Sequence, residues 1–90
     1  MIVSKQQWQY NMQEVIVHKI RMGDVEDPDL FVAEPIYQWQ QTDEGKWIME
    51  NSKQQPMWKR QIDPSSYGYV YTIHAWLDGH ALTYWKLKYE

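Results

Sequence analysis

Residues 69–77 (YVYTIHAWL) are the segment that most restricts what this chain can fold into. They are largely β-branched or aromatic, and no glycine or proline interrupts them, which is typical of a strand. Because side chains alternate along a strand, the odd-numbered residues from Tyr69 to Leu77 share one face. We expect that face to be buried, so the domain must contain a sheet with a layer packed against it.

Three further segments also have strand patterns. These are residues 14–22 (EVIVHKIRM), in a phase that reaches back to Trp8, residues 57–62 (MWKRQI) and residues 81–89 (ALTYWKLKY). Each lacks an internal proline or glycine and is bounded by turn-forming residues.

Residues 27–52 have a helical pattern. Asp27 is placed to cap a helix whose first residue is Pro28. Pro35 lies too deep for a single continuous helix, so we expect a second piece to start there. A further break is predicted near Thr42, which would cap the last piece.

A hairpin is the competing interpretation of residues 36–50. In that case QWQQ and KWIM would be two strands joined around Asp43, Glu44 and Gly45. The helical interpretation is the favoured one.

The last two predicted strands form a hairpin in this scheme. The second of these strands has an apolar set formed by Thr83, Trp85, Leu87 and Tyr89. This set lies on the same side of the sheet as the apolar face of residues 69–77 only if the loop between the strands has an odd number of residues. A two-residue Asp78–Gly79 turn would instead place Lys86 beside Tyr71. Burial of Trp85 and Leu87 favours a loop of three or five residues.

The predicted fold is therefore α+β in the order β-α-β-β-β. An antiparallel four-stranded sheet carries the broken helical segment on one face, in a single domain spanning residues 1–90. The other face of the sheet is predicted to be open.

Composition narrows the setting of the protein. The chain has no cysteine, which excludes disulfides and thiolate chemistry and favours the cytoplasm. No segment has the apolar run of a signal peptide or of a membrane span, so no membrane contact is expected.

Charge is unevenly distributed along the chain. Residues 23–52 hold eight acids against one lysine, while the flanking segments are each mildly basic; the total is −3. Since the acidic segment is the helical one, the open face of the sheet is expected to be the positive side.

The open face supplies the candidate binding residues. In the predicted register they are His74, Trp76, Tyr84, Lys86 and Lys88. The chain has six tryptophans and seven tyrosines, more than one small core uses, and both types are enriched at interfaces. We therefore expect this face to bind a protein partner or a second copy. The alternative is a nucleic-acid or nucleotide site, since aromatic and basic side chains alternate there.

Catalytic and metal sites are not expected. His18, His74 and His80 lack metal-ligand spacing, and Ser65 and Ser66 lack the glycines of a nucleophile elbow. The four glycines are isolated, so no phosphate loop is present and no cofactor is predicted. The chain is predicted not to be an enzyme.

The chain also resembles a group of small uncharacterised proteins of T4-like tailed phages, including marine cyanophages. The resemblance covers roughly residues 22–89 and is strongest in W-x-x-T-x-x-G-K-W-I-M-E, from Trp39 to Glu50, and in Tyr67-Gly68-Tyr69. It implies an accessory viral protein made in a bacterial host, of a kind that acts by binding host machinery. It implies no activity, cofactor or catalytic residue.

Overall fold

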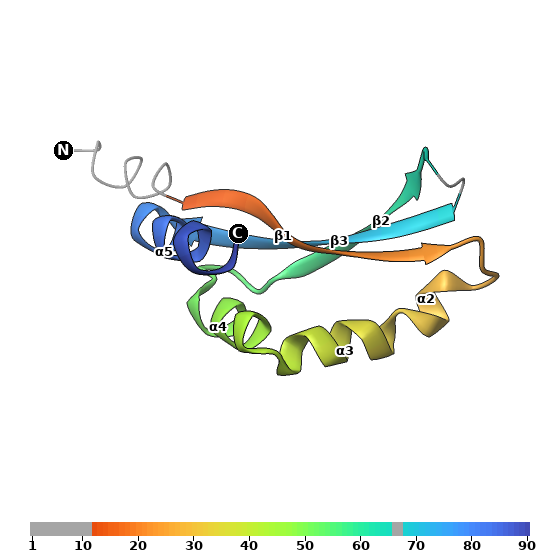
Figure 1. Cartoon of the computed structure of the whole chain (residues 1–90), viewed down its shortest axis with the longest axis horizontal. Coiled ribbons are helices and arrows are strands. Elements are labelled where there is room, and N and C mark those ends of the chain that lie inside the picture. Colours follow the sequence, from red (N-terminus) through yellow and green to blue (C-terminus); the bar gives the residue numbers. More distant parts are fainter. Residues whose placement is uncertain (1–11, 66–67) are drawn as a thin grey trace.

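The computed structural model describes residues 12–65 and 68–90 and contains a three-stranded antiparallel sheet (Figure 1). The strands are β1 (Met12–Gly23), β2 (Met57–Asp63) and β3 (Gly68–Asp78), in the order β1-β3-β2. The strands predicted at residues 14–22, 57–62 and 69–77 are thus confirmed. The predicted continuation to Trp8 lies outside the described residues.

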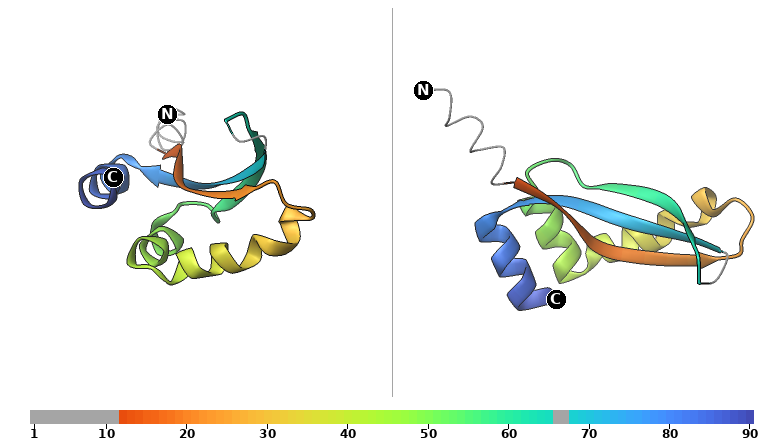
Figure 2. Two further views of the ribbon diagram at one scale, coloured as in Figure 1. Left: turned by 45° about the vertical axis from the view of Figure 1, so that its right-hand side comes forward. Right: turned by 90° about the horizontal axis from the view of Figure 1, so that it is seen from above.

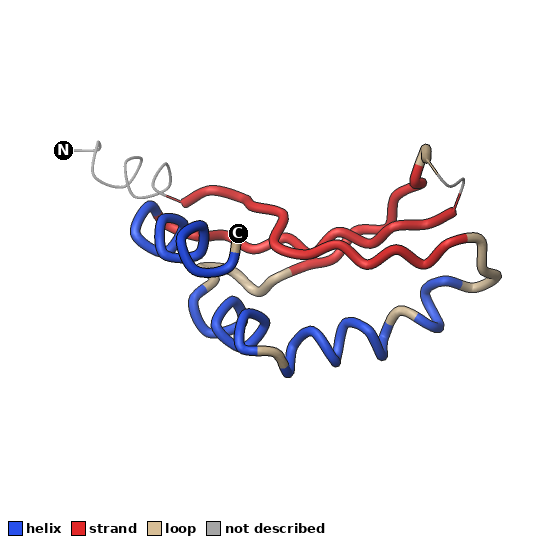
Figure 3. The backbone as a smooth tube through the Cα atoms, in the orientation of Figure 1, coloured by secondary structure: helices blue, strands red, loops and turns tan. Residues whose placement is uncertain are grey.

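The predicted fourth strand is wrong, because residues 81–89 belong to helix α5 (Gly79–Tyr89), as Figure 3 shows. The four-stranded sheet and the order β-α-β-β-β are corrected accordingly, while the α+β class holds. No hairpin joins β3 to a later strand in the described chain, so both the odd-length loop and the two-residue turn are excluded.

Asp78 and Gly79 form the start of helix α5, although the same two residues are also typical of a hairpin turn. The Asp78 carboxylate accepts a hydrogen bond from the Ala81 N–H at 2.8 Å, which is the geometry of a helix N-cap. Leu82, Trp85 and Tyr89 then follow at helical spacing and pack on or in the core. The alternate residues 83 and 87, expected in the core, are both exposed.

The helical middle of the chain consists of α2 (Pro28–Phe31), α3 (Ala33–Gln41) and α4 (Asp43–Asn51). The hairpin interpretation of residues 36–50 is therefore excluded. The predicted break before Pro35 is present, but the second piece begins at Ala33, so that Pro35 is the third residue of α3 and lies in its first turn. Asp27 precedes Pro28 as predicted, but its side chain makes no capping hydrogen bond.

The junction of α3 and α4 is held by Thr42 and Gly45. The Thr42 hydroxyl accepts from the Gly45 N–H at 3.0 Å and donates to the Trp39 carbonyl at 2.6 Å, so the predicted break and cap at Thr42 are confirmed. A Cβ at residue 45 would lie 1.9 Å from the Trp39 carbonyl oxygen. Glycine is therefore required for the two helices to approach this closely.

The helices α2, α3 and α4 lie together along one face of the sheet (Figure 2). The odd-numbered residues of β3 face this layer, as predicted. The buried apolar residues are Val17, Ile20, Val32, Ile36, Trp39, Ile48, Tyr71, Ile73, Ala75, Leu77 and Trp85.

Polar and aromatic contacts join the layers. The His18 ring stacks on Trp39 with centroids 5.5 Å apart, and the Trp85 indole N–H donates to Glu44 at 2.8 Å. Burial lowers the pKa of His18, and the nearby Glu44 carboxylate partly offsets this. Protonation of His18 therefore works against the packed state.

Alanine substitutions at Ile73 and Leu87 test which of these two side chains is buried in the core. Ile73 is 1% exposed, so Ile73→Ala should lower the free energy of unfolding by about 2–5 kcal/mol. Leu87 is 84% exposed, so Leu87→Ala should change it by less than about 0.5 kcal/mol. Chemical denaturation measures both, and equal losses would contradict the helical assignment of residues 79–89.

The cap of α5 predicts a pH-dependent contribution to stability. Hydrogen bonds from the Ala81 N–H and then from Lys53 hold the pKa of Asp78 below its usual value. The resulting stabilisation is complete above the ordinary aspartate pKa of roughly 4 and is lost as pH falls through the lower pKa of the folded state. Asp78→Ala should cost about 0.5–2 kcal/mol at neutral pH. Asp78→Asn keeps a capping acceptor and should cost less, with a flatter dependence on acid; urea denaturation at neutral and acidic pH compares the three proteins.

Candidate functional site

The structure separates the five predicted binding residues. His74 and Trp76 lie on the face of β3 that points away from the helix layer, as expected. Tyr84, Lys86 and Lys88 lie on α5 instead. The Tyr84 ring stacks on Trp47 with centroids 5.1 Å apart, and Lys88 Nζ donates to the Tyr84 hydroxyl at 3.2 Å. The predicted aromatic and basic platform, which the nucleic-acid alternative requires, is therefore not assembled.

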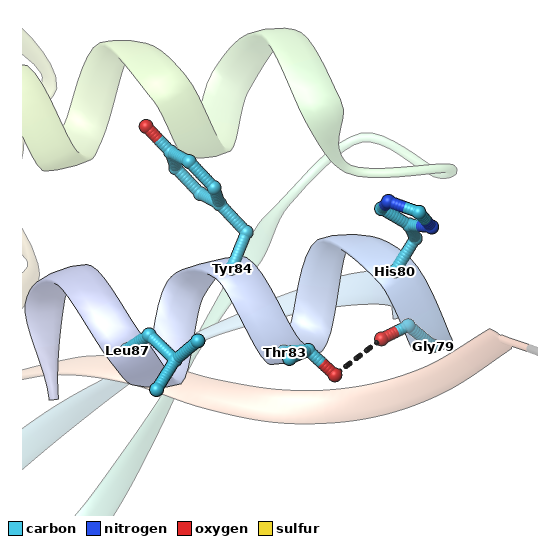
Figure 4. Close-up of a pocket in the computed structure, with 5 residues that line it drawn as sticks. All are labelled: Gly79, His80, Thr83, Tyr84 and Leu87. Atoms are coloured by element: carbon cyan, nitrogen blue, oxygen red, sulfur yellow. Dashed lines mark hydrogen bonds between the residues drawn. The ribbon is translucent and has the colours of Figure 1, made fainter.

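A hollow of about 540 Å³ lies along α5 (Figure 4). All five of its lining residues come from that one helix: Gly79, His80, Thr83, Tyr84 and Leu87. The Thr83 hydroxyl is already bonded to the Gly79 carbonyl at 2.9 Å. A surface formed by one helix, with few polar groups directed to a common point, has little of the geometry of a ligand site.

A polar network occupies the open face of the sheet. Thr72 Oγ1 lies 2.8 Å from His74 Nε2, and the two residues are only 2% and 6% exposed. A Glu14 carboxylate oxygen lies 2.7 Å from His74 Nδ1, yet the two atoms do not form a hydrogen bond, and Nδ1 has no hydrogen-bond partner within the described chain. Lys59 Nζ is 3.6 Å from the same oxygen.

A hydroxyl, an imidazole and a carboxylate in sequence resemble the parts of a nucleophilic triad. Two features work against that chemistry here. Thr72 is almost completely buried, and β3 pairs with a strand on each side, so its backbone N–H groups are committed to the sheet. The network is best understood as the means by which a polar pair is accommodated in the central strand.

Strand β2 is the most exposed regular element. All its residues except Asp63 are exposed, including the large apolar side chains Met57, Trp58 and Ile62. It pairs with β3 on one side, and within the described residues no strand pairs with its other side. An exposed edge with apolar side chains is a template for another strand.

The two edge strands of the sheet differ in how well they are protected against pairing with another strand. Strand β1 shows two register shifts against β3, of the kind that bend an edge away from a new partner. Strand β2 pairs with β3 without any shift. The charged side chains of β2 contact other residues of the domain. Lys59 pairs with Glu14, and Arg60 lies 3.1 Å from Asp29 and over the Tyr69 ring.

A hollow of about 450 Å³ adjoins the start of this edge. It is lined by Gln54, Gln55, Pro56, Met57 and Trp58. Apolar side chains and two amides at the end of a strand could receive a side chain and the backbone ends of an added strand. This site was not predicted from the sequence, although Met57 and Trp58 are adjacent and point to opposite faces of the strand, which was a signal that one of them is exposed.

Thr72→Val tests the polar network of the open face. The substitution keeps the shape of the side chain but leaves His74 Nε2 buried without its partner, which should cost about 1–3 kcal/mol. In a His74→Leu background the same change should cost less, because the imidazole that bonds to Thr72 is already absent. Chemical denaturation of the four proteins of this double-mutant cycle measures the coupling. Equal costs in both backgrounds would show that Thr72 and His74 do not interact.

No helix in the described parts of the chain is long and apolar enough to cross a membrane. Comparison with protein-family models, with curated proteins and with solved structures found no match. The geometry of β2 and its surroundings is therefore the basis for a functional conclusion.

Proposed function

We propose that the protein is a small non-enzymatic interaction domain that binds protein along β2, with a second copy of the chain as its partner. The observation that carries this is the exposed β2 edge, which bears apolar side chains on both faces and lacks the bulges of the opposite edge. Adding a strand there satisfies backbone groups that otherwise face solvent and removes apolar surface from water.

Antiparallel pairing of β2 with its copy gives a specific arrangement. If the two strands meet about Arg60, Trp58 of each copy lies opposite Ile62 of the other, which forms two aromatic–aliphatic cross-strand pairs. The two Arg60 side chains then lie near each other, but each is paired with Asp29 of its own chain. The product is a continuous six-stranded sheet.

The resemblance to small phage proteins supports a binding role. Accessory viral proteins made in a bacterial host often act by binding host machinery, and the resemblance brings no catalytic residue. A strand edge suits that role because its hydrogen bonds can be made to any extended segment, while the side chains give selectivity.

Self-association can be tested with a pair of matched substitutions. Ile62 on β2 is 72% exposed and Ile16 on β1 is 45% exposed. Ile62→Lys introduces a charge into the proposed interface and should shift the protein to monomer, because lysine guards strand edges. Ile16→Lys makes the same chemical change on the opposite edge and should leave the dimer intact.

Size-exclusion chromatography with light scattering over a range of concentrations measures both variants and the unmodified chain. The proposal predicts a concentration-dependent dimer that Ile62→Lys weakens by at least about tenfold, equivalent to about 1.4 kcal/mol. An unmodified chain that stays monomeric at high micromolar concentration, or equal effects of the two substitutions, would contradict it.

A further inference from the structure

A third hollow, on the open face of the sheet, has a different chemistry from the β2 edge. Its volume is about 170 Å³. Side chains from all three strands line it: Lys19 and Arg21 from β1, Gln61 and Asp63 from β2, and Val70 and Thr72 from β3. The hollow therefore exists only when the strands are in register, unlike the surface formed by α5 alone.

The pairing of the strands accounts for this grouping. Arg21 and Gln61 both lie opposite Val70, and Lys19 lies opposite Thr72. Residues directly opposite one another share a face of the sheet. Two cations on β1 and the amide of Gln61 on β2 therefore flank a floor formed by β3.

Two cations and one carboxylate line this hollow, so positive charge is in excess among its described residues. Neither Lys19 nor Arg21 forms an ion pair with any described residue, and both side chains are exposed. The Asp63 carboxylate is buried, and one of its oxygens accepts from the Ser65 N–H at 3.1 Å and the Ser65 hydroxyl at 2.7 Å. Asp63 thus holds the turn after β2, and the hollow keeps a net positive charge.

We propose that this hollow binds a phosphate group. The Arg21 guanidinium can donate two parallel hydrogen bonds to a phosphate, Lys19 supplies a second positive charge, and the Gln61 amide supplies a neutral donor. The volume is below the roughly 300–1,000 Å³ of pockets that enclose whole drug-sized ligands, so it suits a single phosphate group. The acidic helix layer lies on the other face of the sheet and does not oppose an anion here. The site does not require the proposed dimer, although Gln61 belongs to β2, the strand that pairs with the second copy in that dimer.

The experiment is a titration of the full chain with inorganic phosphate, followed by amide chemical shifts, at ionic strength held constant with sodium chloride. Saturable shifts are expected at the amides of Val70, Thr72 and Gln61. Arg21→Gln and Lys19→Gln should each weaken binding by about tenfold or more, because each removes a charge-assisted hydrogen bond. Lys46→Gln makes the same change in charge on α4 and should alter affinity by less than about twofold. Unfolding midpoints confirm that the variants are folded.

A second titration, with a short single-stranded oligonucleotide, distinguishes the source of the phosphate. Binding tighter than that of inorganic phosphate, with salt dependence lost in Arg21→Gln, assigns the hollow to a nucleic-acid backbone. Binding no tighter assigns it to a small phosphorylated compound. Absence of saturable shifts with both probes, or equal weakening by Lys46→Gln, would overturn the proposal.

Discussion

The rest of the structure depends on the central position of β3. Within the described residues β1 and β2 each pair with β3 and not with each other, so every strand contact passes through it. Its odd-numbered side chains form the floor on which the helix layer packs. Its even-numbered residues Thr72 and His74 are also buried, although they lie on the opposite face. Even its last residue has a second role, because Asp78 ends the strand and caps α5.

Local signals in the sequence were sufficient for most elements. Residues 69–77 and 14–22 could be predicted as strands because β-branched and aromatic residues fit a pleated, partly buried surface. The break at Thr42 could also be predicted, since the cap and the following glycine act within a few residues. In each case the physical cause lies inside the segment that shows it.

Helix α5 could not be predicted in the same way. Asp78–Gly79 is compatible with a hairpin turn and with a helix start, and Trp85 belongs to an apolar set under either periodicity. Strand and helix differ here in whether Leu82 and Tyr89 pack against the core while Leu87 remains exposed to solvent. Tertiary packing determines this, not the local sequence. The same ambiguity affected the site. His74 and Trp76 were placed correctly because they lie on β3, whereas Tyr84, Lys86 and Lys88 required the absent fourth strand.

The exposure of β2 also lies beyond local sequence, because MWKRQI has the same pattern in a central strand as at an edge. Whether β2 is a central or an edge strand depends on the order of the strands. That order depends in turn on how many segments join the sheet. With residues 79–89 in a helix, β3 takes the centre and β2 is left with one neighbour. The corrected element thus creates the proposed interaction edge.

The segregation of charge gives the two proposed sites a common geometry. Acidic residues are concentrated in the helix layer, while Lys19, Arg21 and Lys59 lie on the open face with Glu14. When two copies pair about Arg60, even-numbered residues of one β2 lie opposite even-numbered residues of the other, and odd-numbered residues lie opposite odd-numbered ones. The helix layers of both copies therefore lie on the same side of the extended sheet. Both phosphate hollows then lie on the other side, on one continuous surface. A register shifted by one residue would place them on opposite faces, so the register of the dimer determines whether two copies can act on a single polyanionic ligand.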